Sequence, residues 1–241
     1  MSNPWVGSPV SELREKSLRQ IANDCLGISG EFQVVRDFFG YATGAPERVS
    51  LLRQLNLLDA HVNISIIRVG IESFTEGDER EIDAAVAFMR ETYASVGIGV
   101  GAVERYSIPT ADAGGRDHIA DDDEAEELTH EWSTPYGSID VFFVRSYAGS
   151  GIGAAPREGP EDKDKNGPLT GVVLALEGST TVTGFALAWL VGCYLGLKTS
   201  DNSNNLMFET VPNGGNLTFD QGSEMMDSGL AYFGCGPWVR F

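Results

Sequence analysis

Histidines and serines, which often serve as metal ligands, bases or nucleophiles, show little organisation in this chain of 241 residues. The three histidines are His61, His118 and His130. They lack the spacing that places ligands on one helix face, so we expect no metal site composed of them. No serine stands in a G-x-S-x-G elbow, and no cysteine has an evident histidine partner. The sequence therefore indicates no nucleophile with an adjacent base.

One segment carries the residue types that bind a hard cation. Asp162, Asp164 and Asn166 match the first half of a calcium loop, D-x-D-x-N-G. The second half does not follow, because Pro168 comes directly after the glycine and Val173 stands where a bidentate glutamate is expected. We predict a solvated turn, with calcium at Asp162, Asp164 and Asn166 as the weaker alternative.

Two further chemical signals favour structural interpretations. The glycines between Gly149 and Ala154 resemble a dinucleotide loop, but the Pro-containing segment 155–160 cannot open the helix that would hold the phosphates. Cys25, Cys193 and Cys235 are odd in number and form no C-x-x-C pair. Free buried thiols are therefore expected.

The elements that must position any site divide the chain in two. Residues 1–59 carry two helical patterns, at about 11–26 and 47–58, and are interpreted as a helical N-terminal extension. From residue 60 onward the pattern predicts one larger domain, 60–241, that begins with an alternating β-branched run.

Within 60–241 the predicted order is strand, helix, then three strands, which implies a mixed sheet covered by helices and an α+β fold. These five elements are expected at 61–71, 79–96, 99–106, 139–145 and 171–176. Between the second and third strands, the acidic block 121–127 is predicted to be an exposed loop because its like charges cannot be buried. This block is also a candidate docking surface for a basic partner.

A nearly unbroken apolar run, Val182–Leu197, follows the last strand. It is shorter than the roughly 20 residues of a membrane span and contains glycines, so it predicts a helix buried in the domain. No membrane role is expected.

The segment 187–199, LAWLVGCYLGLKT, resembles the active-site helix of metzincin zinc peptidases, written H-E-x-x-H-x-x-G-x-x-H. Gly196 falls on the motif glycine, and Met207 within 204–208 resembles the methionine of the turn beneath the metal. Residues 217–222 resemble the start of the family's last helix. The resemblance covers roughly 60–226 and implies a twisted mixed sheet, an amphipathic helix and a buried former active-site helix.

The residues that carry the metzincin chemistry are all replaced. In the motif, two histidines four residues apart and a third one bind zinc, while a glutamate handles the proton of the attacking water. Trp189 stands at the first histidine, Leu190 at the glutamate, Cys193 at the second histidine and Thr199 at the third. One thiol does not make a metal site, so the resemblance predicts no zinc and no peptidase activity. Packing of Trp189 is expected to fill part of the vacated volume.

We therefore expect a non-catalytic pseudopeptidase that acts by binding protein or peptide, or as a subunit of a larger assembly. Under the resemblance, residues Gly151, Ile152, Gly153 and Ala154 lie on the edge strand, where a peptide would pair by strand addition. The alternatives left open are a hydrolase with an altered metal site or chemistry and a structural component of a secreted or phage-like particle.

Charge and the N-terminal sequence limit partners and location. The formal net charge is -18, which opposes binding of nucleic acid. A basic start followed by an apolar segment is not visible in the first twenty residues, which predicts cytoplasmic synthesis and leaves non-classical export open.

Overall fold

The computed structural model describes residues 60–135, 137–149, 151–156, 169–212 and 214–233. The predicted extension 1–59, the calcium-like turn at Asp162, Asp164 and Asn166, Cys25 and Cys235 lie outside the described residues. In chain order the elements are β1 (Ala60–Val69), η1 (Ile71–Ser73), α5 (Glu76–Ala94), β2 (Ile98–Ile108), α6 (Thr110–Ala113), β3 (His118–Ile119), α7 (Asp122–Trp132), β4 (Ile139–Val144), β5 (Ser146–Tyr147), β6 (Gly153–Ala154), β7 (Val172–Ala175), α8 (Thr180–Tyr194), α9 (Phe219–Met226) and β8 (Tyr232–Phe233).

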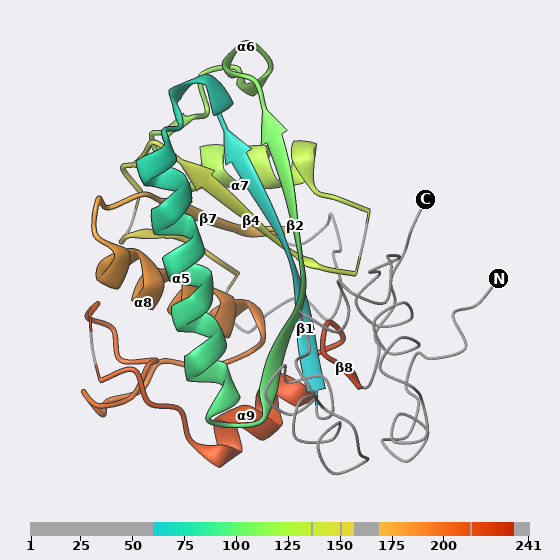
Figure 1. The fold of residues 1–241 in the computed structure, drawn as a ribbon, viewed down its shortest axis with the longest axis vertical. Helices are drawn as coiled ribbons and strands as arrows, with labels where there is room; N and C mark the ends of the chain where they lie inside the picture. Colours follow the sequence, from blue (N-terminus) through green and yellow to red (C-terminus); the bar gives the residue numbers. More distant parts are fainter. Residues whose placement is uncertain (1–59, 136, 150, 157–168, 213, 234–241) are drawn as a thin grey trace, which may run out of the picture.

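The main sheet has the order β2-β1-β4-β7-β6, and β8 pairs with the start of β1. Strands β2, β1, β4 and β7 are parallel, whereas β6 and β8 run antiparallel to their neighbours. The predicted α+β fold with a mixed sheet is confirmed. The strands form a twisted layer behind α5, with α7 on the far side (Figure 1).

Side chains that alternate along the central strands supply apolar residues to two hydrophobic cores, one on each face of the sheet. On β1, Val62, Ile64 and Ile66 face the cluster that contains α5 and α8 residues, whereas Ile67 and Val69 belong to the cluster that contains α7 residues. Both faces of a sheet covered by helices must be apolar, which explains the nearly continuous hydrophobic composition of these strands.

Helix α5 begins three residues earlier than predicted. Its N-cap is Thr75, which forms a capping box with Asp78. Ile82, Ala85 and Met89 then form the buried face. The first predicted strand is also shorter, because the left-handed Gly70 (φ 74°) ends β1 and Ile71 begins η1.

The acidic block was expected to be a loop, and this prediction is wrong. Residues Asp122–Trp132 form α7, with Asp121 as the N-cap accepting from the Glu124 amide. Carboxylates in the first helical turn interact favourably with the helix dipole, while Ala125 and Leu128 are buried against the sheet. The charges are thus accommodated at the helix terminus and on its outer side.

Candidate functional site

Helix α8 carries the positions that would hold the chemistry, and it lies deep in the domain. Ser179 is its N-cap, and the backbone amide of Val182 donates to the Ser179 hydroxyl. Ten of its fifteen residues are buried, and it contains no charged residue. Thr183 donates a hydrogen bond to the buried carboxylate of Glu81, which ties α8 to α5.

Two glycines explain how closely α8 approaches its neighbours. A Cβ atom at Gly184 would lie 3.0 Å from Cβ of Phe88 on α5. A Cβ atom at Gly192 would lie 3.0 Å from Sδ of Met207. Larger residues would push α5 and the 204–208 turn away from the helix.

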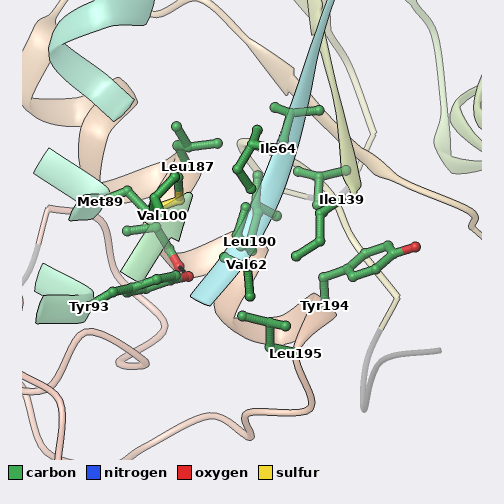
Figure 2. Packing of buried hydrophobic residues seen from close by; sticks show 14 of the residues in the cluster. Val62, Ile64, Met89, Tyr93, Val100, Ile139, Leu187, Leu190, Tyr194 and Leu195 are labelled. Atoms are coloured by element: carbon green, nitrogen blue, oxygen red, sulfur yellow. Dashed lines mark hydrogen bonds between the residues drawn. The ribbon is translucent and has the colours of Figure 1, made fainter. Parts of the chain in front are cut away.

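Leu190, at the position of the motif glutamate, points into the core. It is 1% exposed and packs with Val62 and other residues of the cluster that α5, α8 and the sheet share (Figure 2). Its Cδ1 would lie 2.8 Å from a Cβ atom at Gly153, so the side chain also reaches the edge strand β6. An aliphatic group there offers neither a proton acceptor nor a metal ligand.

Trp189 and Cys193, at the first two histidine positions, both contact this core. Trp189 is partly buried against it, and its Nε1 is shielded from solvent without a hydrogen-bond partner. Cys193 carries a thiol that is 5% exposed. Burial and the neighbouring Cys193 raise the pKa of Tyr93, whose hydroxyl donates to the Ala188 carbonyl at 2.7 Å. Tyr93 is therefore a neutral donor that fixes α5 to α8.

The chain leaves α8 through a left-handed turn. Gly196 has φ 99°, and the amides of Gly196 and Leu197 donate to the carbonyls of Cys193 and Gly192 at 3.0 Å each. These two bonds form a Schellman motif, which stops a helix and redirects the chain. Thr199, at the third histidine position, follows this turn and is exposed.

The turn that contains Met207 is held by a side-chain pair that sequence reasoning missed. Asn205 Nδ2 donates to Gln221 Oε1 at 2.8 Å, and Gln221 Nε2 donates to Asn205 Oδ1 at 3.1 Å. Asn205 Oδ1 also accepts from the Met207 amide at 2.9 Å. Gln221 belongs to the capping box of α9, so one residue both starts this helix and fixes the turn. Only the capping pattern T-x-x-Q was visible in the sequence.

The three histidines lie on three other elements, β1, β3 and α7. His61 is 1% exposed, and burial lowers its pKa to about 4. His118 Nδ1 lies 2.8 Å from Ser146 Oγ, and its Nε2 lies 3.8 Å from Asp117 Oδ2. No sequence pattern indicates this Ser–His contact, which arises because β3 and β5 pair at these residues. Since the His118 side chain is 65% exposed, water competes for these bonds, and we assign the contact to joining the two short strands.

Within the described ranges, no group of three or more His, Cys, Asp or Glu side chains is placed to hold a metal ion. Likewise, no helix in the part of the chain that the structure describes is long and apolar enough to cross a membrane. Residues Ile152, Gly153 and Ala154 lie at the open end of the sheet order, where Gly153 pairs with Leu174 and Ala154 with Val173. Gly151 precedes them with φ 105°.

Comparisons with known proteins find distant structural likenesses. No protein-family model matches the sequence, and no curated protein matches it. Metalloproteinase-II from Bacteroides fragilis is structurally similar with a TM-score of 0.49 and 15% identity, over 70% of this chain and 53% of that one. The archaemetzincin from Methanopyrus kandleri is similar with a TM-score of 0.47 and 12% identity, over 70% of this chain and 95% of that one.

The chain thus spans about half the length of the first of these structures. Both likenesses are of metzincin-type metalloproteinases and concern the arrangement of the backbone.

Proposed function

We propose that this chain is a non-catalytic protein on a metzincin-like scaffold, which acts by binding a protein or peptide. The observation that carries this proposal is the packing of α8, where Leu190 fills the space between the helix, β1 and β6. A general base has to reach a water molecule or the substrate, and a buried aliphatic side chain does neither.

The ligand positions support the same proposal. Neither the indole of Trp189 nor the exposed hydroxyl of Thr199 is a good zinc ligand, which leaves the Cys193 thiol alone. A hydrolase that uses Cys193 as a nucleophile would need an accessible thiolate. With 5% exposure, in contact with the hydrophobic core, Cys193 is better suited to packing.

The edge formed by Ile152, Gly153 and Ala154 is the surface that we propose for peptide binding. Strand β6 ends the sheet, so its outer backbone groups could pair with an extended peptide. Gly153 lets β6 lie close over Leu190 and the carbonyl of Val173. The core beneath the edge is therefore closed by packing, and a peptide would be held by backbone pairing above it.

Metal analysis of the purified full chain tests the absence of catalysis. We expect less than a tenth of an equivalent of zinc after incubation with excess zinc and desalting, and no chelator-sensitive cleavage of casein. One equivalent of zinc together with such cleavage would overturn the proposal.

A variant designed to bind zinc tests the proposed register, which is the alignment of the zinc motif with residues 189–199. The variant Trp189→His/Cys193→His/Thr199→His should acquire one equivalent of zinc, because its first two histidines lie four residues apart on α8. The single variant Thr199→His is the matched control and should acquire none. A triple variant that folds, as judged by circular dichroism, yet binds no zinc would contradict the register.

A further inference from the structure

Helix α9 is fixed to the domain by its inner face. Met225 is fully buried, and a Cβ atom at Gly222 would lie 2.7 Å from Cβ of Val96. The reciprocal amide pair of Gln221 and Asn205 anchors the first turn. The outer side chains of α9 therefore project from a rigid base, which reduces the entropy lost when they bind a partner.

The outer face of α9 exposes a large aromatic side chain. Phe219 is 84% exposed, and among the residues that the structure describes it is the one large hydrophobic on the surface. Its neighbours on this face are Asp220, Ser223, Glu224 and Asp227, all exposed. An isolated exposed Phe gains nothing from folding, because its ring stays in water.

Two of the charges on this face also oppose folding. Glu224 and Asp227 lie at the C-terminal end of α9, where the last turn holds no basic residue. Negative charges at a helix C-terminus interact unfavourably with the helix dipole. Residues that break local rules without a compensating contact are expected at functional surfaces.

We propose that the outer face of α9, defined by Phe219, Asp220, Ser223, Glu224 and Asp227, docks a basic protein segment that also carries apolar side chains. Phe219 is the anchor that inserts among apolar groups, and the surrounding carboxylates select for Lys and Arg. The net charge of -18 opposes docking of a second copy of this chain. This surface is distinct from α8 and β6, so a finding of catalysis would leave the inference standing.

Fluorescence anisotropy with two labelled 12-residue peptides, one of alternating Lys and Leu and one of alternating Lys and Ser, tests the proposal on the full chain. We expect the Lys/Leu peptide to bind, with affinity weakened at least tenfold by Phe219→Ala and at least threefold by Glu224→Gln/Asp227→Asn. The Lys/Ser peptide should bind weakly and be insensitive to Phe219→Ala. The control Asp123→Asn/Glu127→Gln removes the same charge from α7 and should change affinity less than twofold.

The thermal stability of the α9 variants distinguishes a role in binding a partner from a role in stabilising the fold. The α9 variants should unfold at a temperature no lower than the parent chain, since they remove only exposed or dipole-opposed groups. Four results would each overturn the proposal: no binding of the Lys/Leu peptide, equal binding by Phe219→Ala, equal weakening by the α7 control, or a dimer of the parent chain that Phe219→Ala dissociates.

Discussion

The side chains of Trp189, Leu190 and Cys193, which stand at the zinc-motif positions in our proposal, each stabilise the fold much less than a bound metal would. Burying a side chain such as Leu190 contributes about 2–3 kcal/mol, whereas a structural zinc site can contribute about 10 kcal/mol or more. The unpartnered Nε1 of Trp189 offsets part of its own packing. The packing of α8 therefore depends on the whole apolar length of the helix, of which Leu190, Trp189 and Cys193 are only a part.

His61 gives the described domain a pH dependence that can be assigned to one residue. It is buried on β1 near Tyr232, with a ring-centroid distance of 6.1 Å, and its Nδ1 has no partner. Burial lowers its pKa from 6.5 to about 4, so the unfolded chain takes up a proton first as the pH falls. The stabilisation is complete above pH 6.5 and is lost as the pH falls from 6.5 towards 4.

We expect His61 to account for about 2 kcal/mol of the stability lost between pH 7 and pH 5. Urea unfolding of the parent and of His61→Gln at both pH values measures this contribution. His61→Gln should lose correspondingly less stability than the parent, while the exposed-site control His118→Gln should follow the parent. Equal losses in the parent and His61→Gln would show that His61 titrates as it does in the unfolded chain.

At the scale of elements, α9 and the turn that contains Met207 act as one unit through Asn205 and Gln221. Gln221→Ala removes the acceptor of Asn205 Nδ2, and Asn205→Ala removes the acceptor of Gln221 Nε2. Asn205 is only 5% exposed, so water cannot readily replace the lost partner. We expect Gln221→Ala to cost about 1–3 kcal/mol. In a double-mutant cycle with Asn205→Ala, the coupling energy should be about 1 kcal/mol. A coupling below about 0.3 kcal/mol would show that the two residues stabilise the turn independently.

Local patterns of apolar residues predicted those helices and strands whose buried faces are visible as a periodicity or an apolar run in the sequence. The alternation of β1, the periodicity of α5 and the apolar run of α8 each report burial, and the structure confirms all three elements. Helix α7 was missed because its charges dominate the composition, although its N-cap and buried Ala125 and Leu128 follow ordinary helix rules. The block 121–127 illustrates that a charged segment need not be a loop.

Contacts between residues that are distant in the sequence could not be predicted from the sequence alone. The pair of Asn205 and Gln221 depends on how a loop folds over α9, and the contact of His118 with Ser146 depends on β3 pairing with β5. The space that Leu190 fills is set by the distance from α8 to β6. Motif spacing indicated which residues of α8 stand at the zinc-motif positions. The packing around these residues could not be predicted from the spacing.

At the scale of the molecule, the net charge of -18 makes the folded state electrostatically unfavourable. Part of the charge is neutralised locally, since Arg105 pairs with both Glu79 and Asp83, and Arg68 pairs with Glu79. These pairs are partly exposed, and such pairs contribute little each. The remaining carboxylates repel one another more strongly in the compact chain than in the extended one.

Salt should therefore stabilise this protein. Raising the ionic strength shortens the screening length from about 10 Å at 0.1 M to about 3 Å at 1 M, which weakens repulsion between carboxylates across the surface. We expect the unfolding temperature to rise by a few degrees between 0.05 and 0.5 M sodium chloride, as measured by calorimetry. Choline chloride should give the same rise, because screening does not depend on the identity of the cation. A fall with salt would mean instead that the ion pairs around Arg68 and Arg105 outweigh the repulsion, and that the acidic surface is stabilised by the specific placement of its few cations.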